Sequence, residues 1–310
     1  MNNAYMGIDI GGTSIKWMIV TAEGNVLSRG QEATCAASVT QQVINVALSV
    51  LKQHPQICSI GVICPGIIDE KQGEVIYAAN LNLRHTRLTE LLSTATGLPA
   101  CLGHDGRSTG FAEAVMGAGK NTNSFVMIPI GTGISAALYI AQSMWEGHTF
   151  SAGEIGHTPV IPNGEQCNCG QKGCLEVYAS ARGIARRYHQ KTTHDIGVRE
   201  IQNRLGQDPI ADDVWMTAVD ALALSLTHLT LIFDPQTFII GGGLSQAGED
   251  LFTPLRTRLS EMLSWRESPY ICAARMGAMA GMWGAVALAC KLTGSTAYKE
   301  WGHDSDRNMC

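Results

Sequence analysis

The chain has 310 residues, of which 45% are hydrophobic and 16% are charged, and its formal net charge is −5. This composition is typical of a globular protein long enough to form two lobes. The negative charge provides no electrostatic footprint for nucleic acid, so we expect no such partner. No basic and apolar leader precedes the first strand-like segment, and the scattered cysteines favour free thiols in a reducing cytoplasm.

The first predicted element is a strand at residues 5–10, which carries Asp9 near its end. The turn Gly11-Gly12-Thr13 follows and leads into a returning strand at 15–20. Glycines let backbone N–H groups approach a phosphate, the threonine adds a hydroxyl donor and Lys16 adds charge. Asp9 could hold a magnesium ion directly or through water. A Gly-Gly turn is equally typical of a plain hairpin, so both interpretations stay open at this point.

Between the glycine turns, Pro65-Gly66 follows an apolar strand and can bring backbone N–H groups against a ligand. Asp105 follows the apolar segment 98–102 and precedes a helix predicted from about 108 to 116. An acid at the start of a helix is more often an N-cap than a catalytic base. Position alone therefore favours the capping role for Asp105.

Two further glycine turns follow the same logic. The segment 124–140 repeats the plan of strand, Gly131-Thr132-Gly133 turn and strand, which suggests a duplicated domain that grips a phosphate between its halves. Gly241-Gly242-Gly243 follows a strand at 237–240 and opens a predicted helix, a suitable bed for a nucleotide base and ribose. None of these turns has the GxGxxG or GxxxxGK[ST] spacing.

The remaining apolar patterns indicate helices. Residues 214–233 form a long apolar-rich helix pattern, and 177–189 form a second one with arginines on its solvated faces. The tract 271–290 is interrupted by Arg275 and rich in Gly and Ala, which favours a helix packed closely on a sheet over a membrane span. The polar tail 291–310 predicts a weak helix at most and a disordered end.

The most specific stretch runs from Glu154-Ile-Gly-His157 to Cys167-Asn-Cys169 and on to Cys174-Leu-Glu176. Three cysteines and a histidine within this distance match a tetrahedral Cys₃His zinc site. Cysteines can also simply pack in a core, but the prolines and glycines around these ones indicate a loop. A metal-ordered loop that presents Glu154, His157 and Glu176 is suited to a polyhydroxylated ligand.

Taken together in this order, the motifs resemble those of the ROK family of bacterial sugar kinases, open reading frames and sugar-responsive repressors, and most closely its glucokinase branch. The resemblance covers about residues 5–290. It implies an α/β, actin-like (ribonuclease H-like) sugar kinase fold with two lobes and a cleft between them. The smaller N-terminal lobe would comprise residues 1–118, with the tail 291–310 packed on it, and the larger lobe would comprise 119–290 with the zinc loop.

The resemblance also implies an activity and a set of site residues. The activity is ATP-dependent phosphorylation of a hexose, glucose to glucose 6-phosphate in the glucokinase branch, with Asp105 as general base. The implied cofactors are ATP, Mg²⁺ and a structural Zn²⁺, in a cytoplasmic homodimer without nucleic-acid or membrane partners. The sugar-binding residues would be Gly66, Asn80, His104, Asp105, Glu154, His157 and Glu176; the ATP-binding residues Asp9, Gly11, Gly12, Thr13, Lys16, Thr132, Gly133, Gly242 and Gly243; and the zinc ligands His157, Cys167, Cys169 and Cys174.

One departure and several alternatives remain. His104 stands where the family commonly has Asn, which leaves open the sugar hydroxyl that this position contacts. A kinase for N-acetylmannosamine, N-acetylglucosamine, mannose or fructose is the first alternative, and a non-catalytic sugar sensor is the second. A repressor would need a DNA-binding module before the first hairpin, where four residues precede Tyr5.

Overall fold

The computed structural model describes residues 3–301, which form two compact units. Unit 1 comprises residues 3–120, 146–151 and 278–301, and unit 2 comprises 121–145 and 152–277. Each unit contains a five-stranded sheet, and the two sheets have the same strand plan. This repetition agrees with the duplicated domain that the two similar hairpins suggest.

The sheet of unit 1 has the order β3-β2-β1-β4-β8, antiparallel through its first three strands and parallel through its last three. Its strands are β1 (Ala4–Ile10), β2 (Ser14–Thr21), β3 (Val26–Ala33), β4 (Ile57–Cys64) and β8 (Ala100–His104). A smaller antiparallel sheet of β5 (Ile67–Asp69), β6 (Glu74–Ala78) and β7 (Leu83–Thr86), with the 3₁₀ turn η1 (Ala79–Leu81), lies between β4 and β8 in the chain.

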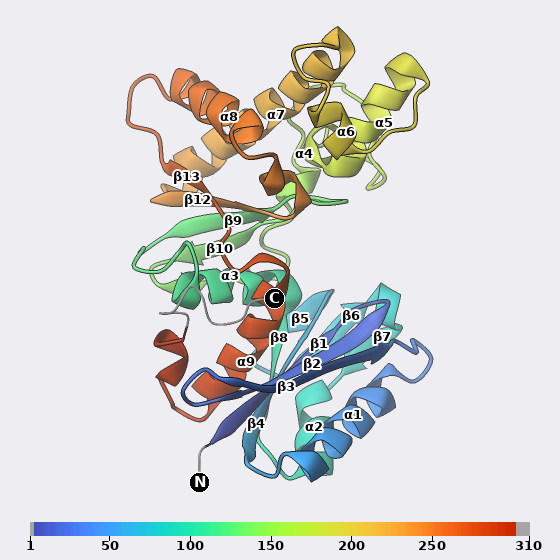
Figure 1. Ribbon diagram of the computed structural model, residues 1–310, viewed down its shortest axis with the longest axis vertical. Helices are drawn as coiled ribbons and strands as arrows, with labels where there is room; N and C mark the ends of the chain where they lie inside the picture. Colours follow the sequence, from blue (N-terminus) through green and yellow to red (C-terminus); the bar gives the residue numbers. More distant parts are fainter. Residues whose placement is uncertain (1–2, 302–310) are drawn as a thin grey trace. The chain divides into compact units, whose positions relative to one another are not determined.

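Helices cover both faces of this sheet (Figure 1). The even-numbered residues of β1 join one core with α1 (Val39–Gln53) and α2 (Leu88–Thr96). The opposite face meets α9 (Ala280–Leu292), which also packs on α3 (Asp105–Met116). The helix comes close because the paired strand residues Gly7 and Gly61 have no side chains: an added Cβ would lie 2.6 Å from Val286 and 2.0 Å from the Ala285 carbonyl oxygen, respectively.

The predicted boundary between the two lobes at the C-terminal end of the chain was wrong. Residues 278–290 were expected in the C-terminal lobe, but they belong to unit 1 because their helix packs on β1 and β4. The apolar tract 271–290 is also not one helix, since its first residues form a strand of unit 2 and only its later part is helical. Trp301 packs on the same unit, where its ring nitrogen donates to the Ala22 carbonyl at 3.0 Å.

The sheet of unit 2 has the order β11-β10-β9-β12-β13. Its strands are β9 (Phe125–Pro129), β10 (Ala137–Ile140), β11 (Ser143–Met144), β12 (Thr237–Gly241) and β13 (Tyr270–Ala273). Its helices are α4 (Leu175–Ala179), α5 (Ala181–Thr192), α6 (Val198–Gln202), α7 (Pro209–Phe233) and α8 (Glu249–Met262), with 3₁₀ turns η2 (Ile155–His157) and η3 (Gly243–Ala247). Two further 3₁₀ turns, η4 (Gly277–Met279) and η5 (Ala297–Lys299), flank α9.

Helix α7 is the central helix of unit 2 and packs against α4, α5 and α8. It begins five residues before the predicted start, because Asp208 caps it through the Ile210 N–H at 2.9 Å and Pro209 occupies its first turn. Within residues 3–301 it is the one helix long and apolar enough to cross a membrane by length and composition. However, 56% of its most apolar stretch is buried inside the protein, as in a core helix.

Two other boundaries differ from the sequence predictions. The predicted helix 177–189 is two helices, because Ser180 adopts an extended conformation and caps α5 through the Gly183 N–H at 2.9 Å. The third glycine turn opens the 3₁₀ turn η3, and an α-helix begins only at Glu249. The predicted disordered end, residues 302–310, lies outside the described part of the chain.

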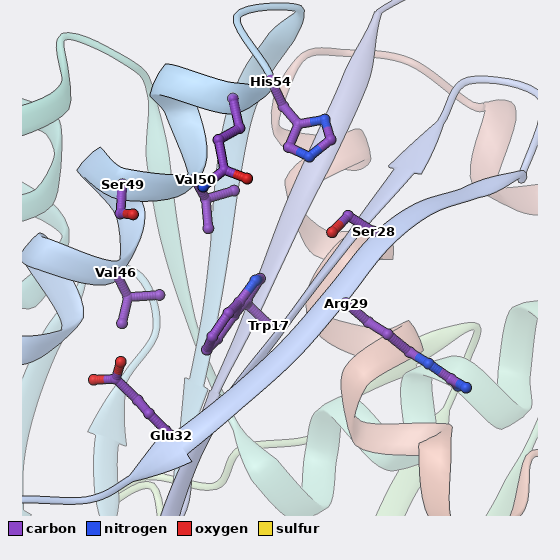
Figure 2. A pocket seen from close by; sticks show the side chains of 9 residues that line it. Trp17, Ser28, Arg29, Glu32, Val46, Ser49, Val50 and His54 are labelled. Carbon is purple, nitrogen blue, oxygen red and sulfur yellow. The ribbon is translucent and has the colours of Figure 1, made fainter.

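On the α1 side of unit 1, a hollow of about 150 Å³ lies between this helix and the strands β2 and β3 (Figure 2). The Trp17 ring packs over its neighbour Gly30, where an added Cβ would lie 2.2 Å from the ring. The residues that line the hollow are Trp17, Ser28, Arg29, Glu32, Val46, Ser49, Val50, Gln53 and His54, none of which is a predicted site residue.

Candidate active site

In unit 1, three parallel strands end at the same edge of the sheet and place polar residues there. Asp9 pairs with Ile63 in the register of β1 and β4, and Cys64 pairs with His104 in that of β4 and β8. Burial raises the pKa of the Asp9 carboxyl, Lys16 on the paired strand opposes the shift, and the Asp105 charge adds to it. The carboxylates of Asp9 and Asp105, both predicted site residues, are therefore close enough to interact.

The first glycine turn lies beside these strand ends. Gly11 N–H donates to the Ser14 carbonyl at 2.9 Å, and the Thr34 hydroxyl donates to the Gly11 carbonyl at 2.6 Å, which braces the turn. Gly12 and Thr13 are exposed. An added Cβ on Gly12 would lie 3.6 Å from the Asn80 side chain, so the predicted phosphate turn and the predicted sugar contact are neighbours within unit 1.

Gly66 occupies a position that only glycine fits. Its φ is +117°, and an added Cβ would lie 2.3 Å from the Tyr77 carbonyl oxygen. The turn after β4 is therefore pressed onto β6, and η1 with Asn80 follows β6 directly. This packing brings Gly66 and Asn80, which are predicted sugar contacts, to the same region of unit 1.

The structure assigns the helix cap to His104 and not to Asp105. The Nδ1 atom of His104 accepts hydrogen bonds from the N–H groups of Gly106 at 3.1 Å and Arg107 at 3.4 Å, and α3 begins at Asp105. An accepting Nδ1 carries no proton, so the neutral ring has its N–H at Nε2. The interpretation of Asp105 as an N-cap from position alone is wrong, because the helix begins three residues earlier than predicted.

With the cap supplied by its neighbour, the Asp105 carboxylate is available for other contacts. Its Oδ1 accepts from the Gly106 N–H at 2.7 Å and lies 3.4 Å from His104 Nδ1. The hydrogen bond from Gly106 uses Oδ1 alone, and 44% of the side chain is exposed. Oδ2 can therefore reach a ligand while Oδ1 keeps the carboxylate oriented.

In unit 2, the second and third glycine turns lie side by side. Ile130, directly before the second turn, donates its N–H to the Gly241 carbonyl at 2.9 Å and accepts from the Leu244 N–H at 3.2 Å. Gly242 has a φ of +75°, and an added Cβ would lie 2.3 Å from the Ile130 carbonyl oxygen. A hollow of about 210 Å³ adjoins the third turn, lined by Val198, Arg199, Gln202, Asn203, Trp215, Gly243, Leu244, Gln246 and Ala247.

Glu176 faces the second turn. Its Oε2 accepts from the Ile134 N–H at 3.1 Å, and an added Cβ on Gly133 would lie 2.6 Å from that oxygen. The same oxygen would lie 3.4 Å from an added Cβ on Gly156, in the middle of the Glu154-to-His157 motif. Glu154 itself is exposed at the start of η2. The structure thus brings Glu176, Gly133 and the motif around Gly156 together within unit 2.

The four predicted metal ligands form one cluster. One ligand atom from each of His157, Cys167, Cys169 and Cys174 lies within 4.8 Å of all the others. Cys169 Sγ and Cys174 Sγ are 3.7 Å apart, as are Cys167 Sγ and His157 Nδ1. A tetrahedral zinc ion with sulfur ligands at about 2.3 Å would separate two sulfurs by about 3.8 Å. Donor types and spacing therefore fit a metal ion bound through Nδ1 of the histidine.

Backbone hydrogen bonds give the metal loop its shape. Cys167 N–H donates to the Gln171 carbonyl at 2.8 Å, and Gly173 N–H donates to the Glu165 carbonyl at 2.9 Å. Gly173 has a φ of +77°, and an added Cβ would lie 1.8 Å from the Ile161 carbonyl oxygen. The Glu165 carboxylate binds Arg187 Nε at 2.9 Å and also Arg186, which ties the loop to α5. The loop is thus held by its own backbone hydrogen bonds and by the ion pairs of Glu165 with α5.

Sequence reasoning missed two residues of unit 1 that contact the His104-Asp105 junction. Glu70 lies in a polar turn after β5, and Arg107 lies in the first turn of α3 with 4% of its side chain exposed. An acid in a polar turn and an arginine in a helix are ordinary surface residues in a sequence. Only their contact in the folded protein, between residues 37 positions apart in the chain, distinguishes Glu70 and Arg107 from ordinary surface residues.

Comparisons with known proteins identify the fold and the family of this chain. A ROK family glucokinase from Streptomyces griseus, solved in complex with glucose and AMPPNP, superposes with a TM-score of 0.75 at 29% identity, covering 93% of this chain and 100% of that one. The protein is therefore an α/β protein of the actin-like fold, as predicted. More specifically, it belongs to the ROK family, whose profile matches residues 5–291.

Curated relatives include proteins with different sugars. The glucokinase of Streptomyces coelicolor is 30% identical over 306 residues, covering 92% of this chain and 96% of that protein. The N-acetylgalactosamine kinase AgaK of a Shewanella species is 27% identical over 308 residues, covering 95% of this chain and 99% of that protein. Family membership thus narrows the ligand to a sugar without naming it.

Proposed function

We propose that this protein is an ATP-dependent sugar kinase that phosphorylates a hexose at its primary hydroxyl, with glucose as the first candidate. The observation that carries the proposal is the state of Asp105. It directly follows β8, its orientation is held through Oδ1, nearly half of its side chain is exposed, and it interacts with the half-buried Asp9 near the end of β1. Similarity to glucokinases supports the choice of glucose.

In this proposal, Asp105 acts as the general base. Its carboxylate accepts the proton of the primary hydroxyl, and the sugar oxygen then forms a bond to the γ-phosphorus of ATP. The bond between that phosphorus and the β,γ-bridging oxygen breaks, and ADP leaves. A magnesium ion held near Asp9 would neutralise phosphate charge. Little covalent help is needed from the protein, so its main task is to position the two reactants.

The other predicted residues would share the binding. Gly12, Thr13 and Lys16 in unit 1 and Thr132 and Gly133 in unit 2 would bind phosphates, with Gly11 completing the first turn. Gly242 and Gly243 would face adenosine, and the hollow beside Gly243 gives the base room. Gly66, Asn80, His104, Glu154, His157 and Glu176 would surround the sugar hydroxyls.

We further propose that the metal is a structural zinc ion. Binding through His157 Nδ1 leaves the Nε2–H as a donor to a sugar hydroxyl, and the three thiolates hold the loop that leads to Glu176. The assignment as homodimer and cytoplasmic protein stays a prediction from the family resemblance.

The test is a coupled ADP-release assay with purified protein, ATP and Mg²⁺ across a sugar panel. The panel contains glucose, mannose, fructose, N-acetylglucosamine, N-acetylmannosamine and N-acetylgalactosamine. We expect the highest kcat/KM with glucose. A higher value for another sugar would replace glucose and keep the kinase, whereas no turnover with any sugar, together with sugar binding by calorimetry, would favour a sensor.

A further inference from the structure

An ion pair between Glu70 and Arg107 holds the junction between β8 and α3 and hydrogen-bonds to the backbone of His104. Glu70 Oε1 accepts a hydrogen bond from the His104 N–H at 3.1 Å and another from Arg107 Nε at 2.7 Å. The Glu70 side chain is 27% exposed and that of Arg107 is 4% exposed. One carboxylate oxygen therefore connects the strand end before Asp105 with the first turn of the helix that follows it.

Arg107 extends the connection to two carbonyl groups. Its NH2 donates to the Ile68 carbonyl at 3.4 Å, and its NH1 donates to the Phe150 carbonyl at 3.2 Å. All three guanidinium nitrogens thus have acceptors, which a buried guanidinium requires. The first carbonyl belongs to β5, and the second belongs to a segment that is distant in sequence.

That segment, residues 146–151, we name the strap. The chain belongs to unit 2 up to Trp145 and again from Ala152, but the strap itself packs with unit 1. Lys71, next to Glu70, holds its first residue through an ion pair with Glu146 at 2.7 Å. Near its other end, Phe150 has a φ of +61°, a left-handed conformation that is unfavourable for a non-glycine residue.

The strap is followed closely by a residue that we propose to bind the sugar, because Glu154 is the fourth residue after Phe150. Between them, Gly153 packs against the Ala136 carbonyl oxygen, where an added Cβ would lie 2.0 Å away. This close packing restricts the position of the segment between Phe150 and Glu154. Arg107 thus binds Glu70, which holds the residue before the proposed base, and it also binds Phe150, four residues before the proposed sugar contact Glu154.

From these contacts we propose that Glu70 and Arg107 are positioning residues for the phosphoryl transfer. They orient Asp105 through the His104 backbone, and they hold the strap in the conformation that presents Glu154. Neither residue contacts the sugar or ATP. The inference rests on the proposed function, because positioning has a purpose only if Asp105 accepts a proton. A displacement of about 1 Å at such a site can cost about 100-fold in rate.

Three variants separate positioning from stability: Glu70→Leu, Arg107→Met and the double variant. Glu70→Leu removes the acceptor and leaves a buried guanidinium without its counter-ion, so its melting temperature should fall the most. The double variant removes both charges and should recover much of that loss. We expect kcat to fall about 10–100-fold in all three, including the double variant, while the KM for ATP stays within about twofold.

The control is Arg204→Met, which removes an arginine that binds Glu200 and Tyr188 in unit 2. It should change stability without changing kcat. Hydrogen exchange in peptides covering 146–154 provides a readout without catalysis, and it should accelerate in Arg107→Met but not in the control. The proposal would be overturned by wild-type exchange rates in Arg107→Met. It would also be overturned if the double variant recovered kcat together with its melting temperature.

The outcomes also distinguish this inference from the proposed function. Wild-type protein without turnover on any sugar in the panel contradicts the kinase proposal, and the positioning role with it. An active wild type whose three variants keep its kcat contradicts only the role of Glu70 and Arg107.

Discussion

Glu176 Oε2 accepts a hydrogen bond from the backbone N–H of Ile134 at 3.1 Å, over a separation of 42 residues. Glu176 is the second residue after the predicted metal ligand Cys174, and Ile134 directly follows the second glycine turn. The contact therefore joins the Cys₃His cluster to a turn that we expect to bind phosphate. A residue predicted to bind sugar thus also shapes a turn predicted to bind phosphate.

Two substitutions at Glu176 should divide these roles. Glu176→Gln keeps a carbonyl oxygen for the Ile134 N–H, so ATP binding should stay within about threefold while sugar binding weakens, because a neutral amide is a poorer acceptor. Glu176→Ala removes the acceptor, and both ligands should bind more weakly. Isothermal calorimetry with each ligand measures this. Unchanged ATP affinity in Glu176→Ala would show that the turn keeps its shape alone.

Asp105→Asn should preserve the fold and sugar binding but lower kcat about 1000-fold, because the amide cannot accept the hydroxyl proton. Since His104 supplies the cap of α3, the melting temperature should change little. Steady-state kinetics with calorimetry of sugar binding checks this. A kcat within about tenfold of wild type would place the base elsewhere.

One zinc ion should be found per chain by elemental analysis of protein purified without chelators. Cys169→Ser should lower the metal content, because an exposed hydroxyl is a poor zinc ligand. Through Glu176, it should weaken sugar and ATP binding together. The matched control is Cys35→Ser, an exposed cysteine outside the cluster, which should keep the metal. Wild-type protein without zinc would exclude the assignment.

His104→Asn and His104→Leu should differ in both stability and specificity. Asn is a good N-cap and can still hydrogen-bond a hydroxyl, so its variant should stay active with altered preference among sugar epimers. Leu can do neither, and we expect a loss of about 1 kcal/mol in stability and about 1–3 kcal/mol in kcat/KM.

The cap and sugar roles of His104 can be separated by comparison with Asp208→Ala. This change removes the cap of α7 in unit 2 and should lower stability while kcat/KM stays constant. Kinetics with glucose, mannose and N-acetylglucosamine decides the question. Equal losses for every sugar in both His104 variants would mean that His104 supports the helix only.

Asp9→Asn should stabilise the protein at neutral pH while reducing catalysis. Burial raises the pKa of Asp9 above its usual value of 3.8, so the folded state holds more protons than the unfolded state between these two pKa values. The free energy of unfolding therefore falls as pH rises through this window, and the loss persists at pH 7.

The gain from Asp9→Asn should accordingly be larger at pH 7 than at pH 4. Chemical denaturation in buffer without magnesium and nucleotide measures it. Glu23→Gln is a control of opposite sign, because a hydrogen bond from Thr21 lowers the pKa of the exposed Glu23. A gain of equal size at both pH values would show that the Asp9 charge carries no cost.

What the sequence determined about this protein was local. The glycine turns, the Cys₃His spacing and the strand before each turn depend on neighbouring residues, and their order was sufficient to indicate the family and the α/β fold. The clustering of His157 with the three cysteines was predictable because all four residues come from one stretch of 18 residues, 157–174. Such spacings constrain geometry before any tertiary contact forms.

Only the tertiary structure decided which distant residues meet. The cap on α3, the ion pair of Glu70 with Arg107 and the bond from Glu176 to Ile134 each depend on where separate elements pack. Helix α9 joins unit 1 because Gly7 and Gly61, far from it in the chain, leave room for its backbone. Side-chain periodicity reports which face of an element is buried, but the partner on that face is chosen by the packing of the whole unit.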